Sequence, residues 1–268
     1  MAGSHVVLDL GCGNRSFHYE TCPSRIVALD EQFVGKKIER EDPRIQYVLG
    51  RSQSIPLADR SIDAVVCHHT LEHFDDYRKA LAEIARVLRP EGWLWIAIPN
   101  GFGFDDKLYR FVFAGGGHVN RFTRDGLVKE VQTITGLTVV AMCDFFSSFI
   151  YFKKASPWEL QYYPPLARRV TKLPNALLSC GILSINFATR IVDKILGYRS
   201  SQYGWGFVFS KTEMTIAKLA SCFNVCRKCG SGHLFHTIKR PTIFGLSFYH
   251  CPNCRELNSL VAPPRGLD

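Results

Sequence analysis

Residues 6–14 read Val6-Val7-Leu8-Asp9-Leu10-Gly11-Cys12-Gly13-Asn14, an apolar run that ends on two glycines. This pattern is typical of a buried parallel strand that enters a tight turn. Gly11 and Gly13 have no Cβ, so the backbone can pass close to a ligand, and Asp9 offers oxygens that accept from an ammonium or a ribose hydroxyl group. A tight turn without any ligand is the alternative interpretation of the glycines.

Strand and helix patterns alternate along the sequence after this turn. Strands are predicted at residues 25–30, 45–49, 62–67, 93–98, 137–143 and 206–210. Helices are predicted at residues 75–89 and, with Thr123 as the N-cap, at about 124–135. The alternation predicts an α/β fold with a Rossmann-like, mostly parallel sheet and helices on both faces.

Two regions interrupt or follow this pattern. An insertion of about residues 145–203 is rich in Phe, Tyr, Pro, Lys and Arg, and long insertions are usually functional or disordered. The composition changes again after residue 211. We therefore predict one domain over residues 1–211, including the insertion as a lid, and a small module over residues 212–268.

The 268-residue chain has a formal charge of +9, which is unevenly distributed. Residues 1–144 contain 17 Lys and Arg against 19 Asp and Glu, whereas residues 145–268 contain 16 against 5. The whole basic excess therefore lies in the C-terminal part, where it could meet a polyanion or lipid headgroups. The 46% hydrophobic content excludes a disordered or fibrous protein.

The sequence predicts neither a leader nor a membrane span. Its first residues already have the pattern of a strand, without a basic and apolar leader. The longest apolar candidate, residues 173–189, is 17 residues long and contains Pro174, Asn175 and Asn186, whereas a spanning helix needs about 20 mostly apolar residues. We expect a cytoplasmic protein that could also contact the membrane periphery through its insertion.

Four of the ten cysteines form two CxxC pairs near the end of the chain. Cys226 and Cys229 are separated from Cys251 and Cys254 by 21 residues, slightly more than is common for paired zinc knuckles. The pattern resembles a zinc ribbon, and four thiolates leave no open position, so the zinc would be structural. His233, His236 and His250 could substitute as ligands, although they are expected to be surface residues. The other six cysteines are expected to be reduced thiols.

Five motifs carry a resemblance to a known family. They are, in order, VVLDLGCGNR, the pair Asp30-Glu31, SIPLADRSIDAVVCHHTLEHFDD, ALAEIARVLRPEGWLWIAIPN and HVNRFTRDGL. Together they resemble class I S-adenosylmethionine-dependent methyltransferases, in particular the members that act on small molecules. The resemblance covers residues 5–144 and the closing strand at 204–211, but neither the insertion nor the cysteine module.

The resemblance implies a cofactor site. It assigns the methionine end to Asp9, Gly11, Gly13 and Asn14, the ribose to Asp30, the adenine to Glu31, Arg51 and Ser52, and the space over the cofactor to His68 and His69. Many relatives have Asp in place of Arg51, so the backbone of Ser52 is the better candidate for the adenine amino group. A dinucleotide is disfavoured, because Ser16 stands where a third glycine would be.

Methyl transfer from a sulfonium needs alignment and, for a hydroxyl or amine acceptor, a base. The candidate bases are His73 and His118, because unperturbed histidine titrates near neutral pH. As alternatives, His73 caps the following helix or bonds to backbone, and His118 only completes a loop. We expect a small-molecule or lipid- or glycan-linked acceptor.

The insertion is expected to cover the acceptor, because relatives usually have helices before the glycine turn and this sequence begins its first strand at about His5. A truncated chain is the alternative. Aromatic residues next to Lys and Arg suit an apolar acceptor with an anionic group or a membrane interface, although they could equally pack the lid onto the sheet. Two other functions stay open, an RNA methyltransferase that uses the ribbon and the basic lid to bind RNA, and a non-catalytic zinc-bearing partner protein.

Overall fold

The computed structural model describes residues 5–32, 42–152, 157–197, 199–214, 216, 219–238, 242–243 and 246–263. The chain forms two compact units. The first unit comprises residues 1–99, 119–142 and 205–219, and the second unit comprises residues 100–118, 143–204 and 220–268. The whole insertion and most of the cysteine module therefore fall in the same unit. The boundary expected at residue 211 stays a prediction.

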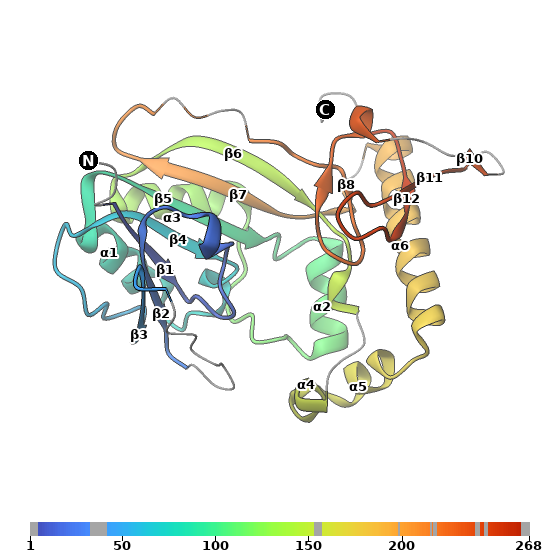
Figure 1. Ribbon diagram of the computed structural model, residues 1–268, viewed down its shortest axis with the longest axis horizontal. Coiled ribbons are helices and arrows are strands. Elements are labelled where there is room, and N and C mark those ends of the chain that lie inside the picture. Colours follow the sequence, from blue (N-terminus) through green and yellow to red (C-terminus); the bar gives the residue numbers. More distant parts are fainter. Residues whose placement is uncertain are drawn as a thin grey trace. The chain divides into compact units, whose positions relative to one another are not determined.

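A seven-stranded sheet forms the centre of the fold (Figure 1). Its strands are β1 (Val6–Leu10), β2 (Arg25–Asp30), β3 (Ile45–Leu49), β4 (Ile62–His68), β5 (Leu88–Pro99), β6 (Thr138–Phe146) and β7 (Gln202–Ser210). Their order is β3-β2-β1-β4-β5-β7-β6, and β1 pairs in parallel with both β2 and β4. The Rossmann-like, mostly parallel sheet is thus confirmed, and its topology reverses between β1 and β4, where ligands bind in such folds.

Two helices of the first unit pack against each other and against the sheet core. They are α1 (Tyr77–Val87) and α3 (Arg124–Thr135). Asp76 caps α1 by accepting from the amide of Lys79 at 3.0 Å, and Thr123 caps α3 as predicted. Helix α1 ends at Val87 and β5 starts at once, so Pro90 lies within the strand rather than at a helix stop.

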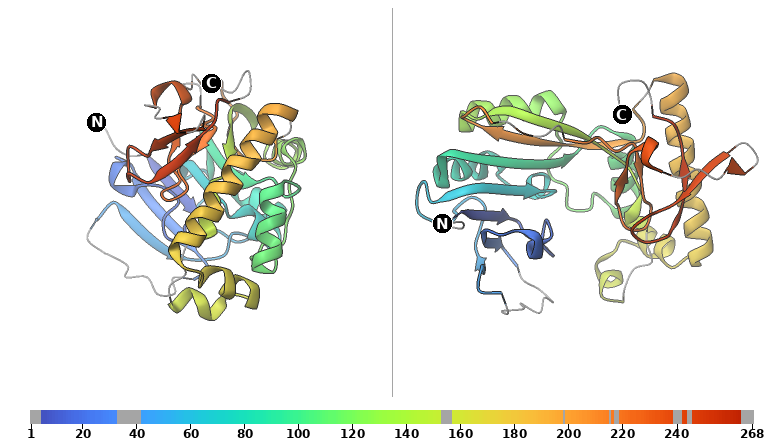
Figure 2. Two further views of the ribbon diagram at one scale, coloured as in Figure 1. Left: turned by 90° about the vertical axis from the view of Figure 1, so that its right-hand side faces the viewer. Right: turned by 45° about the horizontal axis from the view of Figure 1, so that its top comes forward.

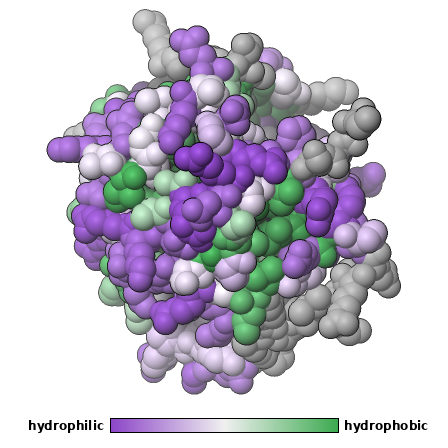
Figure 3. Space-filling model, turned by 90° about the vertical axis from the view of Figure 1, so that its left-hand side faces the viewer, coloured by the Kyte–Doolittle hydropathy of each residue, from purple (hydrophilic) through white to green (hydrophobic). Residues whose placement is uncertain are grey.

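The connection between β1 and β2 differs from the predicted alternation. Although helices were expected on both faces, the described residues 11–24 form only the short 3-10 helix η1 (Tyr19–Thr21). Tyr19 is fully buried and packs with Cys12, Ile26 and Ala28 on the sheet. The surface shown in Figure 3 is largely hydrophilic and carries a band of hydrophobic residues.

The second unit contains the remaining helices and five short strands. The α-helices are α2 (Phe104–Phe113), α4 (Pro157–Tyr162), α5 (Pro165–Thr171) and α6 (Asn175–Leu196). Two 3-10 helices, Ile150–Phe152 and Phe235–Thr237, also belong to this unit. The 3-10 helix η2 (Leu71–His73) belongs to the first unit. The strands are β8 (Asn224–Val225), β9 (Gly232–His233), β10 (Thr242–Ile243), β11 (Leu246–His250) and β12 (Leu257–Leu260). Helix α2 packs against α5, and α6 runs beside β12 (Figure 2).

Helix α6 is long and apolar enough to cross a membrane, judged by length and composition alone. It is the one such helix among the described residues. A core helix of a soluble protein can pass the same test, but such a helix is mostly buried, whereas only 28% of the apolar stretch of α6 is buried within the chain.

Candidate cofactor and metal sites

The glycine turn lies at the reversal point of the sheet. The amides of Gly11 and Cys12 both donate to the carbonyl of Leu29, at 2.8 and 3.0 Å, which bends the chain across the end of β2. Gly11 has a φ of +68°, and a Cβ there would lie 2.6 Å from Cγ2 of Thr70. Both the backbone angle and the close approach therefore require glycine at this position.

Asp9 is completely buried beneath the turn. Its Oδ2 accepts from the Tyr19 hydroxyl at 2.5 Å and from the Ser16 amide at 3.0 Å, whereas Oδ1 has no hydrogen-bond partner. Burial raises the pKa of Asp9, and the bonds from Ser16 and Tyr19 counteract the rise. A buried acceptor without a donor is costly. The turn therefore fits a ligand that brings a hydrogen-bond donor, such as an ammonium group.

Asp30 at the end of β2 lies next to the turn. Its Oδ2 accepts from the amide of Gly13 at 2.8 Å, and its Oδ1 accepts from the amide of Gln32 at 3.0 Å. Each carboxylate oxygen has a further lone pair, so both can still accept from a diol such as ribose. Asn14, also in the turn, is exposed.

Glu31 and Arg51 are neighbours of this carboxylate. Their side chains form an ion pair with Arg51 Nε 3.5 Å from Glu31 Oε1, and the amide of Gly50 donates to the carbonyl of Asp30 at 3.0 Å. Ser52 is buried, and its hydroxyl donates to Gln53 at 3.2 Å. The structure thus brings the predicted ribose and adenine residues together at the ends of β2 and β3.

Two histidines lie at the end of β4, on the other side of the reversal point: His68 is the last residue of the strand and His69 follows it. His68 Nδ1 accepts from Trp95 Nε1 at 3.3 Å, and burial lowers the pKa of His68 to about 4, so its ring is neutral. His69 has a φ of +53°, and its Nδ1 lies 3.6 Å from Oε1 of the buried Glu72. Glu72 Oε2 has no hydrogen-bond partner. A neutral His68 presents no charge that would repel a sulfonium.

His73 and His118, the two candidate bases, have different surroundings. His73 ends η2 and is exposed, and its backbone amide donates to the carbonyl of Thr70 at 2.9 Å. His118 belongs to the second unit, where its Nδ1 lies 2.9 Å from Oδ1 of the buried Asp106. Arg110 joins the two, because it donates to Oδ2 of Asp106 at 2.5 Å and to the carbonyl of His118 at 2.7 Å.

The pKa values of Asp106 and Asp105 are shifted in opposite directions. Burial acts to raise the pKa of Asp106, but hydrogen bonds from His118 and Arg110 outweigh it and keep that pKa below its usual value. Burial raises the pKa of Asp105 to about 6, while a hydrogen bond from Ser147 lowers it in part. Asp106 is therefore the ionised partner of His118, which favours the tautomer with its proton on Nδ1 and a lone pair on Nε2.

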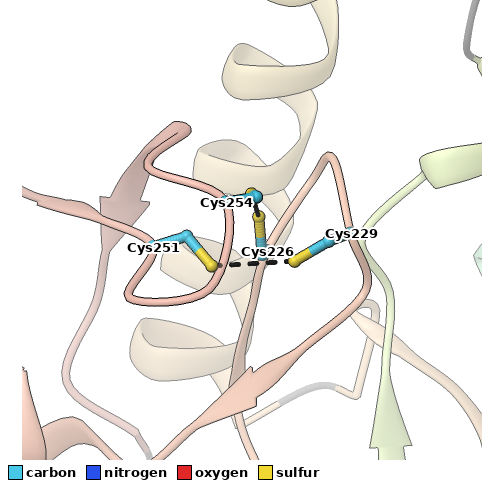
Figure 4. A group of neighbouring side chains, drawn as sticks. All are labelled: Cys226, Cys229, Cys251 and Cys254. Carbon is cyan, nitrogen blue, oxygen red and sulfur yellow. Dashed lines mark hydrogen bonds between the residues drawn. The ribbon is translucent and has the colours of Figure 1, made fainter.

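The four cysteines of the CxxC pairs converge in the second unit (Figure 4). All four sulfur atoms lie within 4.8 Å of one another, and the pairs Cys226–Cys254 and Cys229–Cys251 are each separated by 3.6 Å. A disulfide would need about 2.05 Å. A tetrahedral zinc with Zn–S bonds of about 2.3 Å places its ligands about 3.8 Å apart. The geometry therefore fits a tetrahedral metal ion.

The two knuckles have matching turns. The Gly230 amide donates to the carbonyl of Cys226 at 3.0 Å, and the Arg255 amide donates to the carbonyl of Cys251 at 2.8 Å. Gly230 and Arg255 both have positive φ, of 73° and 58°. His233 lies with Nε2 3.3 Å from the sulfur of Cys251, so it is a neighbour of the cluster and not simply a surface residue.

Several residues that organise these sites were not predicted. No recognisable sequence spacing connects four of them to the residues that they contact: Tyr19, Thr70, Glu72 and Asp106. Thr70 and Glu72 had a usable signal, since both lie within the motif SIPLADRSIDAVVCHHTLEHFDD. Arg227, between the first two cysteines, is largely buried and bonds Glu256 and the carbonyls of Leu257 and Ser179.

Comparison with known proteins agrees with this geometry. Residues 8–96 match the family model described as a methyltransferase domain. A probable S-adenosylmethionine-dependent methyltransferase of Mycobacterium tuberculosis is 30% identical over 149 residues, which is 52% of this chain and 51% of that protein. A demethylmenaquinone methyltransferase of Renibacterium salmoninarum is 37% identical over 94 residues, 34% of this chain and 40% of that protein. The chain thus spans about half the length or less of these curated relatives.

Solved structures show the same fold. A chain from the complex of the Haloferax volcanii Trm112 methyltransferase activator matches with a TM-score of 0.51 and 16% identity, covering 81% of this chain and 86% of that one. Geranyl diphosphate C-methyltransferase from Streptomyces coelicolor matches with a TM-score of 0.50 and 12% identity, covering 78% and 74%. At these identities the solved structures show the fold alone. The match to the family model ends before the cysteine module.

Proposed function

We propose that this protein transfers a methyl group from S-adenosylmethionine to a small-molecule or lipid- or glycan-linked acceptor. The observation that carries the proposal is the arrangement at the reversal point of the sheet, where a glycine turn with an orphaned buried carboxylate oxygen lies beside the carboxylate of Asp30. The residues proposed to bind the cofactor are Asp9, Gly11, Gly13, Asn14, Asp30, Glu31, Arg51, Ser52, His68 and His69.

In this proposal the bound cofactor supplies the activated methyl group, and the chain supplies binding and alignment. Asp30 holds the ribose hydroxyls, and the neutral ring of His68 lines the cofactor without opposing its positive charge. His118 removes the acceptor proton at Nε2, because Asp106 fixes the proton on Nδ1. His73 is the second candidate for this step.

We also propose that the four CxxC cysteines bind one structural zinc ion. The sulfur separations support this proposal, and four thiolate ligands leave no coordination position for a substrate. The metal would therefore stabilise the second unit and take no part in methyl transfer.

Calorimetry with S-adenosylmethionine tests cofactor binding. Asp30→Ala should weaken binding by about tenfold or more, since hydrogen bonds to a charged group contribute about 1.5–3 kcal/mol. Asp125→Ala is the matched control, because Asp125 is an exposed carboxylate on α3. No binding by the parent protein would refute the proposal and would favour the non-catalytic partner.

The acceptor class is tested by incubating the protein and labelled cofactor with cell extract. Label in soluble metabolites, lipid or glycan precursors supports the proposed acceptor. Label in RNA, together with RNA binding that weakens steeply with salt, would refute the proposed acceptor in favour of the RNA methyltransferase.

A further inference from the structure

Helix α6 buries several polar residues and exposes several apolar ones. Its buried face carries Leu178 and Ile182 together with four polar residues that are at most 7% exposed, Asn186, Thr189, Arg190 and Asp193. Surface helices of soluble proteins bury apolar residues and expose charged ones. Polar residues that face inward while apolar residues face outward are instead typical of helices in contact with lipid.

The buried polar residues are fully committed to internal bonds. Arg190 donates to the carbonyls of Phe223 and Ser147, at 3.0 and 2.7 Å, and to Asn186 Oδ1 at 2.5 Å. Asp193 accepts from the amide and the hydroxyl of Ser201, at 2.8 and 2.5 Å. These bonds fix the rotation of α6 about its axis, so the opposite side must face away from the second unit.

That opposite side forms what we call the outer stripe, which consists of Leu177, Gly181, Ser184, Ala188 and Ile195. Leu177 and Ile195 are five helical turns apart and point the same way, and the other three residues lie within about 40° of that direction. Leu177 is 60% and Ile195 71% exposed, and a Cβ added at Gly181 would meet nothing within 4 Å. The outer stripe contains no charge.

Exposed cations lie at both ends of the outer stripe. Arg168, Arg169 and Lys172 precede α6, and Lys194 and Arg199 lie at and just after its last turn; all five are exposed. Of these, Arg199 also forms an ion pair with Asp144 at 3.7 Å. The one acidic residue between positions 160 and 211 is Asp193, and it is buried. An uncharged stripe between two cationic ends complements an anionic bilayer surface.

We propose that the outer stripe of α6 docks on an anionic lipid bilayer, with the helix lying in the plane of the interface. A second copy of the chain is a poorer occupant, because pairing two α6 helices would bring cationic ends together without an acidic residue between them. RNA is also a poorer occupant, because exposed leucine and isoleucine side chains offer its phosphates and bases no charge and no hydrogen-bonding group. The proposal does not depend on methyl transfer.

Sedimentation of the full chain with vesicles tests this proposal. Vesicles of phosphatidylcholine mixed with phosphatidylglycerol should bind the protein at least about tenfold better than phosphatidylcholine alone, since each cation near such a surface contributes about 1 kcal/mol, or about fivefold. The double variant Leu177→Glu, Ile195→Glu should lose about tenfold or more of this binding. Phe111→Glu, an equally exposed apolar site on α2, should retain it.

Charge reversal provides an independent test of the proposal. Lys194→Glu should weaken binding to anionic vesicles by about tenfold, whereas Lys129→Glu, at an exposed site on α3, should not. Thermal melts of all variants check that they fold. The proposal is overturned if the parent does not bind anionic vesicles, if the double variant binds as well as the parent, or if ultracentrifugation without lipid shows a dimer that the double variant dissociates.

Discussion

Asp105 should make the stability of this protein fall as pH rises. Its side chain is 6% exposed, and burial raises its pKa to about 6 from an unfolded value of 3.8. Between these values the folded chain binds a proton that the unfolded chain has lost, so the stabilising contribution is complete at low pH and is lost as pH rises through about 6. At about 1.4 kcal/mol per pH unit, the loss approaches about 3 kcal/mol.

The assay compares urea unfolding of the parent and Asp105→Asn from about pH 4 to about pH 8. Asparagine cannot ionise, so the free energy of unfolding of the variant should gain about 3 kcal/mol relative to the parent across this range. Asp125→Asn, at an exposed site, is the control. Taking the difference between proteins cancels other groups that titrate, including the cysteine thiols.

A second variant sharpens this test. The Ser147 hydroxyl donates to the carboxylate of Asp105 and lowers its pKa, so Ser147→Ala should move the transition to higher pH. The titration can also be followed directly by the carboxyl carbon resonance of Asp105. A difference between parent and Asp105→Asn that stays constant from about pH 4 to about pH 8 would refute the reasoning.

Three further predictions concern the sites. Asp106→Asn should reduce kcat by about a hundredfold or more, with cofactor affinity by calorimetry unchanged, because the amide no longer fixes the imidazole tautomer. Arg190→Met should cost about 3 kcal/mol in denaturant unfolding by leaving buried carbonyls unpaired, whereas the exposed Lys172→Met should cost almost nothing. Cys251→Ser should lower bound zinc, measured by elemental analysis, well below one ion per chain, whereas Cys180→Ser should retain it.

The first unit was largely predictable because its apolar residues follow simple periods. The strands β1 to β4 begin at the predicted residues, and α3 has the predicted bounds and cap. The glycine turn and Asp30 were predictable as neighbours, since strand ends of a parallel sheet meet at one edge. By contrast, the hydrogen bond from Tyr19 to Asp9 joins residues ten positions apart in an irregular segment, where no period applies.

The second unit was harder to predict for a physical reason. Sequence periodicity assumes that a helix buries its apolar side. In α6 the buried side also carries polar residues, so Asn186 was counted against a membrane-spanning helix although its amide bonds the carbonyls of Ser148 and Ile182 inside the unit. The contact of Asp106 with His118 spans a glycine loop whose path the sequence does not specify.

The cysteine module and α6 depend on each other through two arginines. Arg227, between the first pair of cysteines, donates to the carbonyl of Ser179 on α6 at 2.9 Å, and Arg190 on α6 donates to the carbonyl of Phe223 just before those cysteines. Breaking the cysteine cluster would therefore release two of the contacts that orient α6. Since neither arginine contacts the glycine turn in any described bond, loss of the metal should weaken vesicle binding before it affects cofactor binding. The order of these two losses during titration with a chelator separates the role of the module from that of the first unit.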